Sequence, residues 1–168
     1  DEVGLDVGAK VAAVMHGAYG ERLQPSDVLE RMLADDRQGR KNGRGFYEYR
    51  DGKKQGPDPS VPTLLGVTPQ ANTPATTVER RLLYVMLNEA AMAAHEGVIR
   101  SPRDGDVGAI FGIGYPAFRG GPLRTIDALG PARVVDTLRE LAGIYGPRFR
   151  PAPSLVAMAE RGEKFYPV

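Results

Sequence analysis

The chain has 168 residues and 42% hydrophobic content, enough to bury a core in one domain or in two small ones. Its 22 lysines and arginines balance 21 aspartates and glutamates, and it has no cysteine, so nothing indicates a nucleic-acid partner, a disulfide, a thiolate zinc site or a cysteine nucleophile. No apolar run approaches the roughly 20 residues of a membrane span, and no secretory signal pattern occurs.

Two helices are predicted near the N-terminus. Apolar residues recur at helical spacing from Val3 to Met15, and Gly17 and Gly20 end the run. Ser26 is a good N-cap for a second, short helix with its own apolar stripe. The N-terminal part of the chain is therefore expected to be helical.

An extended aromatic segment and a linker are predicted next. Two glycines break any helix between Lys41 and Tyr49, and the aromatic residues there alternate as they would on an extended segment. The basic cluster from Arg37 to Arg44 is expected on solvated faces and loops. Residues 51–77 carry five prolines and three glycines without sustained periodicity, so we expect a linker lying over the surface.

The second half of the chain is dominated by helical patterns. The longest predicted helix covers 78–98, with Thr77 as its cap, and Ser101 caps a helix that ends near residue 111. No alternating strand run of useful length occurs, so the predicted fold class is all-α. Further helices are expected at about 122–129, 132–145 and 154–161.

The sequence also contains an internal repeat. Shifting it by 126 positions places Asp1, Gly4, Gly17, Tyr19, Gly20, Arg22, Pro25, Leu29 and Met32 on identical residues, from Asp127 to Met158. After a shortening by seven residues, Gly43, Phe46 and Tyr47 fall on Gly162, Phe165 and Tyr166. Coincidence among common helix-end residues is the alternative explanation.

The repeat predicts tandem, duplicated helical units. The second unit has about fifty residues of helix and Gly-rich turn before Asp127, whereas nothing precedes Asp1 in the first. We therefore expect a first copy truncated at its N-terminus over residues 1–50, the linker over 51–77 and a second copy over 78–168. Asp1 to Tyr47 and Asp127 to Tyr166 should superpose.

Several motifs resemble a known family. The segments D-E-V-G-L-D-V-G from Asp1 and G-R-K-N-G-R-G-F-Y-E-Y from Gly39 resemble the end of the C-terminal domain of 3-hydroxyacyl-CoA dehydrogenases. L-N-E-A from Leu87, V-I-R-S-P-R-D-G-D-V-G-A-I-F-G-I-G-Y-P from Val98 and F-R-G-G-P-L-R-T-I-D-A-L-G from Phe118 resemble a second copy of it. Two copies are typical of the multifunctional α subunit of bacterial fatty-acid oxidation complexes, and the anaerobic-type form is the most similar.

The resemblance implies that the chain is a fragment of a β-oxidation enzyme. Such a parent oxidises 3-hydroxyacyl-CoA to 3-oxoacyl-CoA with NAD bound to a Rossmann domain. It would also carry an enoyl-CoA hydratase/isomerase domain, pair with a thiolase β subunit and lie in the cytoplasm. The helical part would cover the acyl-CoA cleft. The family's active-site asparagine falls upstream of Asp1, and the matching stretch of the second copy, Glu79 to Arg81, is charged.

No catalytic, cofactor-binding or metal-binding residue is therefore predicted in this chain, and the fragment alone is expected to be inactive and structural. His16 and His95 both lie near predicted helix ends, and Glu96 is only adjacent to His95 in sequence, so neither histidine indicates a base held by a carboxylate. Ser101 and Ser154 are expected to be helix caps rather than nucleophiles.

Three further groups have structural explanations. Gly112 to Ala117 satisfies the G-x-G-x-x-A dinucleotide pattern, but a predicted helix rather than a strand precedes it, so we expect a turn whose glycines allow close packing. Lys41 and Arg44 could touch a CoA phosphate in the intact enzyme, although a solvated basic turn is the simpler interpretation. The aromatic residues shared by the two copies are expected in the core of each unit: Phe46, Tyr47, Phe165 and Tyr166.

Two rival functions remain open at this point. One is a non-catalytic helical interaction module, and the other is a small nucleotide-binding enzyme that uses Gly112 to Ala117. A further expectation concerns Val7, Val11 and Val14, which should line an apolar groove left by the missing front half of the first copy. The second copy in the same chain, tethered at high effective concentration, is expected to fill that groove, with a second molecule as the alternative.

Overall fold

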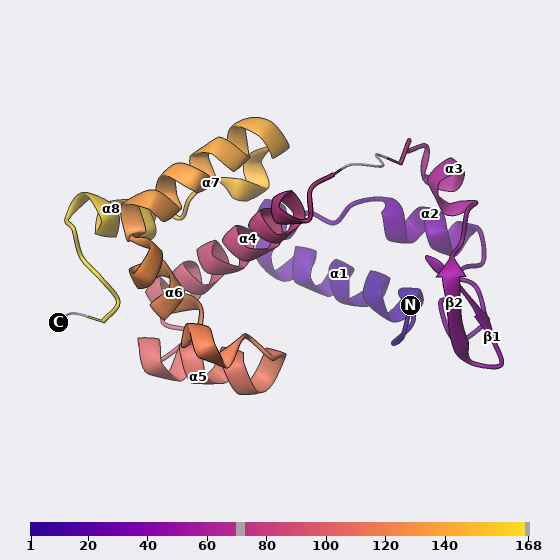
Figure 1. Cartoon of the computed structure of the whole chain (residues 1–168), viewed down its shortest axis with the longest axis horizontal. Helices are drawn as coiled ribbons and strands as arrows, with labels where there is room; N and C mark the ends of the chain where they lie inside the picture. The colour runs from indigo at the N-terminus through magenta and orange to yellow at the C-terminus, as the bar shows by residue number, and fades with distance from the viewer. Residues whose placement is uncertain (70–72, 167–168) are drawn as a thin grey trace. The chain divides into compact units, whose positions relative to one another are not determined.

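The computed structural model describes residues 1–69 and 73–166. They form two compact units, which divide between residues 72 and 73. In Figure 1 the first unit runs from indigo to magenta and the second from pink to yellow. The expected all-α class is confirmed, because a two-stranded hairpin is the only sheet in the part of the chain that the structure describes.

Unit 1 is a small helical body with a hairpin. Its elements are α1 (Leu5–Tyr19), the 3-10 helix η1 (Gly20–Leu23), α2 (Val28–Ala34), β1 (Tyr47–Arg50), β2 (Lys53–Pro57) and α3 (Val61–Leu65). Leu5, Met32 and Val61 are its buried apolar residues, so one side chain from each helix forms the centre of the core. Phe46 packs against this cluster from the loop before β1, as expected for a core aromatic residue.

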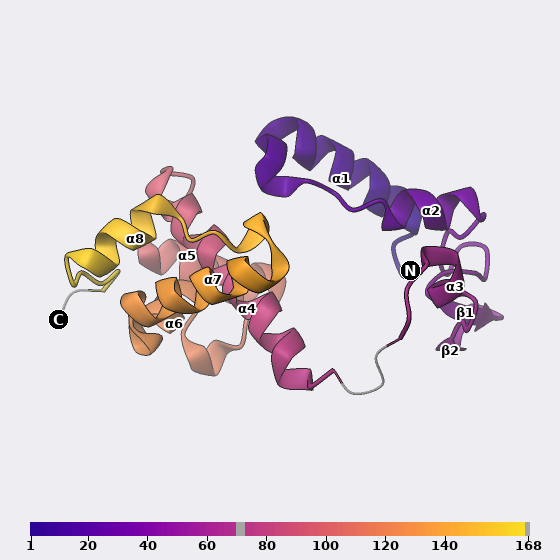
Figure 2. The ribbon, with the colours of Figure 1, turned by 90° about the horizontal axis from the view of Figure 1, so that it is seen from above.

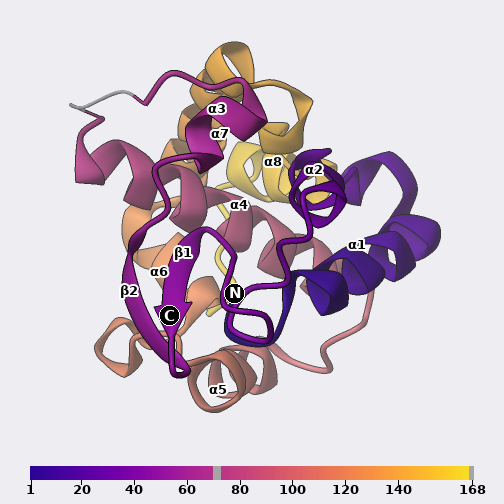
Figure 3. The same cartoon turned by 90° about the vertical axis from the view of Figure 1, so that its right-hand side faces the viewer.

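The hairpin of unit 1 was not predicted. Its strands pair antiparallel, and Arg50 lies opposite Lys53 across the two-residue turn of Asp51 and Gly52 (Figure 3). Both turn residues have positive φ, 49° and 70°, as in a type I′ turn. Every residue of β2 is exposed, so the strand lacks the apolar alternation that reveals a half-buried strand. The Asp-Gly dipeptide was the available signal.

The stretch expected to be a linker contains folded elements. Besides β2, residues 51–77 include α3, whose Val61 is 8% exposed. Arg31 of α2 donates hydrogen bonds to the carbonyl oxygens of Leu64 and Leu65, at 2.6 and 2.8 Å. The prolines and glycines of this stretch therefore separate short elements of unit 1 rather than forming one continuous surface linker.

Unit 2 is built around a central helix. Its elements are α4 (Ala75–His95), α5 (Pro102–Ile113), η2 (Ala117–Arg119), α6 (Pro122–Leu129), α7 (Pro131–Tyr145), η3 (Pro147–Phe149) and α8 (Pro153–Glu160). The helix α4 contacts α5, α6, α7 and α8 (Figures 1 and 2). Leu87, Leu123, Ile126, Val134 and Leu138 are fully buried in its core.

The predicted caps have mixed outcomes. The hydroxyl of Ser101 accepts a hydrogen bond of 3.1 Å from the backbone nitrogen of Asp104, as expected. The caps expected at Ser26, Thr77 and Ser154 are wrong, because α2, α4 and α8 have no side-chain cap. The proline at the first position of α8 already supplies a helical φ and has no N–H to cap, and it places Ser154 inside the first turn.

Candidate functional site

The strongest polar feature shared by the two units is an aspartate that closes each unit. In unit 1, the carboxylate of Asp1 accepts hydrogen bonds of 3.0 Å from the backbone nitrogens of Phe46 and Tyr47. In unit 2, the carboxylate of Asp127 accepts hydrogen bonds of 2.9 Å from the backbone nitrogens of Phe165 and Tyr166. We call each arrangement an aspartate clamp. Each clamp joins the start of one helix to an aromatic segment about 40 residues later.

The helices that follow the two clamps have the same register. Leu5–Tyr19 and Pro131–Tyr145 are both 15 residues long, and their bounds differ by 126 positions, the shift that aligns the sequence repeat. A glycine with positive φ precedes each helix, Gly4 at 102° and Gly130 at 89°. The repeat in the sequence therefore coincides with a repeat of local structure.

The buried polar residues of unit 1 are used for folding. Arg37 is 1% exposed, so the expectation of a solvated basic cluster is wrong at this residue. Its guanidinium donates to Asp35 at 2.8 Å, to Asp58 at 2.6 Å, to Ser60 at 2.6 Å and to the carbonyl of Gly45 at 2.9 Å. Hydrogen bonds from Ser60 and Arg37 lower the pKa of Asp58 to about 2. A long-range set of partners of this kind leaves no local signal in the sequence.

The rest of the basic cluster is paired at the surface. Lys41 donates to Asp6 at 2.7 Å, and Arg44 donates to Asp35 at 3.2 Å. The hydrogen bond from Lys41 holds the pKa of Asp6 below its usual range. These pairs favour the interpretation of Lys41 and Arg44 as a solvated basic turn over contact with a CoA phosphate, because both cations already have carboxylate partners within unit 1.

Unit 2 has its own buried carboxylate, which the sequence did not single out. Asp106 is 3% exposed and accepts hydrogen bonds from the backbone nitrogens of Leu123 and Arg124, at 2.7 and 3.1 Å. The phenol of Tyr166 donates to it as well, at 2.7 Å. Burial, then the hydrogen bond to Asp106, raises the pKa of Tyr166 to about 12. Asp106 thus joins α5, the start of α6 and the C-terminal segment.

The charged stretch Glu79 to Arg81 lies on α4 and faces α7. Arg80 donates to Glu140 at 3.0 Å, and the guanidinium of Arg81 stands 4.3 Å from the ring centroid of Tyr145. The hydrogen bond from Arg80 lowers the pKa of Glu140. In unit 2, therefore, the position at which the family has an active-site asparagine holds side chains that attach one helix to another.

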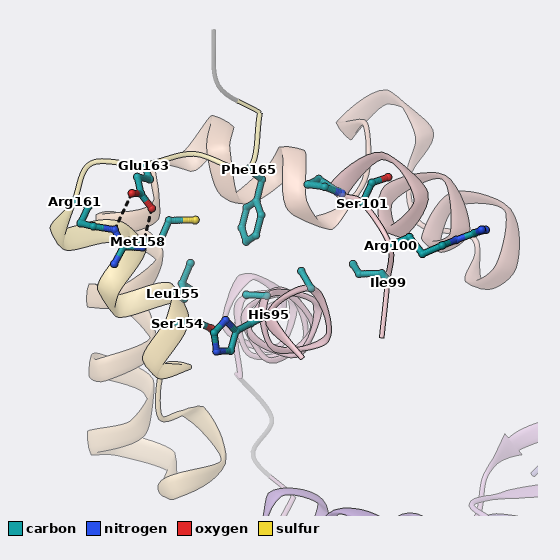
Figure 4. A pocket seen from close by; sticks show the side chains of 13 residues that line it. His95, Ile99, Arg100, Ser101, Ser154, Leu155, Met158, Arg161, Glu163 and Phe165 are labelled. Carbon is teal, nitrogen blue, oxygen red and sulfur yellow. Dashed lines mark hydrogen bonds and ion pairs between the residues drawn. The ribbon is translucent and has the colours of Figure 1, made fainter. Parts of the chain in front are cut away.

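One cavity in unit 2 combines charged and apolar residues. It has a volume of about 270 Å³ and lies between α4, α8 and the start of α5. Figure 4 shows the ring of Phe165 within it, with the ion pair of Arg161 and Glu163 on one side and Ser101 on the other. The hydroxyl of Ser101 caps α5, and the carboxylate of Glu163 is held by Arg161 at 2.7 Å. These side chains are committed to structural contacts rather than poised for proton transfer.

The two histidines lie in different units and at helix ends. The Nδ1 atom of His16 lies 3.0 Å from the carbonyl oxygen of Gly20, at the end of α1. His95 is the last residue of α4 and is exposed at the edge of the cavity in Figure 4. Among residues 1–69 and 73–166, no group of three or more histidine, aspartate and glutamate side chains could hold a metal ion.

The dinucleotide pattern does not fit a bound NAD. Gly112 and Ile113 form the last turn of α5, and Gly114, with φ of 72°, ends that helix, so no strand delivers a phosphate to a helix N-terminus. The expectation of a helix-connecting turn agrees with this geometry, but the expected close packing is wrong at these two glycines. A Cβ atom added at Gly112 or Gly114 would meet nothing within 4 Å. Gly114 is instead required by its positive φ.

Another apolar feature of unit 2 is a groove of about 280 Å³ between α4, α5 and α6. It is lined by Met86, Ala90, Ala93, Ile99, Ile113 and Leu123, among others. Phe111 and Phe118, 86% and 87% exposed, lie on the same part of the sequence. No helix within the described residues is long and apolar enough to cross a membrane.

Comparison with known proteins agrees with the domain that the sequence motifs indicate. Residues 1–49 match the family model of the 3-hydroxyacyl-CoA dehydrogenase C-terminal domain. The fold resembles the crystal structure of 3-hydroxybutyryl-CoA dehydrogenase from Escherichia coli K12, with a TM-score of 0.67 and 20% sequence identity. The match covers 95% of this chain and 50% of that one, so the chain spans about half the length of its structural relative.

These findings confirm the recognition made from the sequence. Residues 1–49 carry the C-terminal helical domain of the 3-hydroxyacyl-CoA dehydrogenases, and the likeness of fold extends over nearly the whole chain.

Proposed function

We propose that this chain is the C-terminal part of an NAD-dependent 3-hydroxyacyl-CoA dehydrogenase, which oxidises 3-hydroxyacyl-CoA to 3-oxoacyl-CoA. The match of residues 1–49 to the family's C-terminal domain carries the proposal. The structural relative, named as a 3-hydroxybutyryl-CoA dehydrogenase, supports it, and the coverage of half of that chain leaves room for a further domain.

The role of this part is structural in the proposal. Its most buried polar side chains, Arg37 and Asp106, hold segments of the fold together, and both aspartate clamps do the same. The proposed NAD-binding Rossmann domain and the catalytic pair belong to other parts of the protein. The helical units would form part of the wall of the acyl-CoA cleft and pack against those parts.

The proposal includes a tandem duplication. The shared aspartate clamp, the common length of α1 and α7 and the shift of 126 positions support descent of the two units from one ancestral domain. Coincidence among helix-end residues does not account for two carboxylates that each bind two successive backbone N–H groups of a Phe-Tyr pair.

A finer context rests on motif resemblance alone. It is the multifunctional α subunit of a bacterial fatty-acid oxidation complex in the cytoplasm, with an enoyl-CoA hydratase/isomerase domain and a thiolase β subunit as partner. The tandem units support this context, because two copies are typical of that subunit.

A non-catalytic interaction module is the second candidate. The exposed Phe111 and Phe118 favour it, since contiguous apolar surface marks sites of protein contact. The same surface is also compatible with packing against other domains of a dehydrogenase.

The test compares the full-length protein with the 168-residue chain. We expect the full-length protein to reduce acetoacetyl-CoA with NADH, followed by the loss of NADH absorbance, and the chain alone to show neither turnover nor NAD binding by calorimetry. A full-length protein that lacks this activity would contradict the dehydrogenase proposal and favour the interaction module. Micromolar NAD binding by the chain alone would restore Gly112 to Ala117 as a nucleotide site.

A further inference from the structure

The helix α1 presents an apolar strip that no element of unit 1 covers. The strip consists of Val7, Val11, Val14 and Met15, which recur at helical spacing along one face. Val11 is 54% exposed, Val14 is 71% exposed and Met15 is 39% exposed. The core of unit 1 lies on another face of the helix, around Leu5. The groove expected from the sequence is therefore present as an open face of this unit.

The corresponding positions of unit 2 show what such a face receives. At the shift of 126, Val11 corresponds to Thr137, Val14 to Glu140 and Met15 to Leu141. Thr137 and Leu141 are only 8% and 2% exposed, because the central helix α4 and its neighbours pack on α7. The same face of the same helix is thus covered in one unit and open in the other.

We propose that the α1 strip is the seat of a long amphipathic helix of the α4 type, supplied by the part of the protein that precedes Asp1. The inference rests on the proposed function, which makes this chain part of a longer dehydrogenase. It names the face of unit 1 through which that preceding part is held.

The chemistry of the strip distinguishes this helix from α4 itself. In unit 2, Arg80 of α4 forms an ion pair with Glu140. The position of Glu140 is taken by Val14 in unit 1, so α4 from a second copy would place an arginine beside a valine without a carboxylate partner. The helix that covers α1 should therefore carry an apolar residue at this point of contact.

The absence of cysteine from the chain permits a direct test. Val11→Cys places a single thiol in the strip, and Lys10→Cys places one on an exposed neighbouring position as the matched control. Each variant is made in the 168-residue chain and in the full-length protein. The rate of alkylation at each introduced cysteine is followed by peptide mass spectrometry, and circular dichroism checks the fold of each variant.

We expect Val11→Cys to react about 10-fold or more slowly in the full-length protein than in the 168-residue chain, whereas Lys10→Cys should change little. Equal rates for Val11→Cys in the two proteins would overturn the inference. Protection already complete in the 168-residue chain would assign the strip to unit 2, and protection that grows with the chain's concentration would assign it to a second copy, and either result contradicts the proposal.

Dehydrogenase activity of the wild-type full-length protein is measured in parallel. An active enzyme with an unprotected Val11→Cys contradicts only the docking inference. A protected thiol in a protein without dehydrogenase activity contradicts only the proposed function.

Discussion

Asp1 and Asp127, 126 positions apart, make the same pair of hydrogen bonds to the backbone of a Phe-Tyr sequence. A carboxylate offers two oxygens, and here each oxygen receives one of two successive N–H groups. The clamp fixes the path of the chain where no helix or strand does so. Its recurrence in both units indicates that it is part of the domain's design rather than a local accident.

The first prediction is that Asp127→Asn destabilises unit 2. The amide of asparagine keeps one acceptor oxygen but turns an NH₂ group toward the second backbone N–H. We expect a loss of about 1–3 kcal/mol in the free energy of unfolding, measured by urea denaturation with circular dichroism. The control is Asp136→Asn, because Asp136 is exposed and paired only with Arg139. Equal effects of the two substitutions would remove the clamp's importance.

The second prediction concerns the buried arginine of unit 1. Arg37→Met leaves Asp58 without its cation inside the protein, and Asp35 loses one of its two partners. We expect a destabilisation of about 3–5 kcal/mol, enough to unfold so small a unit. Arg40→Met is the matched control, since Arg40 forms only an exposed pair with Glu2 and should change the free energy of unfolding little. Nuclear magnetic resonance of unit 1 signals distinguishes a local loss of structure from a global one.

The third prediction is a dependence of stability on alkaline pH. The pKa of Tyr166 is raised from 10.0 to about 12, so the folded state keeps the phenol protonated where the unfolded state would lose its proton. The contribution of this group is therefore complete below pH 10 and is lost as the pH rises toward 12. Titration of phenolate absorbance in wild type and Tyr166→Phe should show one late-titrating phenol missing from the variant. A wild-type curve in which that phenol titrates near pH 10 would contradict the prediction.

The fourth prediction separates the glycines of the dinucleotide-like pattern from a glycine that packing requires. Gly112→Ala should be neutral or stabilise by up to about 1 kcal/mol, because the residue is helical and a Cβ atom would enter open space. Gly121→Ala should destabilise, because Gly121 has a φ of 107° and its Cβ atom would collide with the side chain of Asp106. Thermal unfolding of the two variants measures both effects. A strongly destabilising Gly112→Ala would show that this turn has a role beyond connecting helices.

Local patterns in the sequence determined most of the helices. The runs at 122–129 and 132–145 agree with α6 and α7 to within one residue, because glycine and proline mark both ends of each helix. The repeat at 126 positions agrees with the bounds of α1 and α7 for the same reason. The hairpin was missed because β2 is exposed along its whole length and so has no apolar period.

Tertiary structure decided which residues are buried or open. Arg37 and Lys41 belong to one basic cluster in the sequence, yet only Arg37 is buried, because Asp58 and Ser60 reach it from a segment about 20 residues away. Val11 and Thr137 occupy the same place in two copies of one helix, and the apolar residue is the exposed one because no helix in unit 1 packs on that face. Periodicity shows that a helix has an apolar face, but only the neighbours that pack on it determine whether water is excluded.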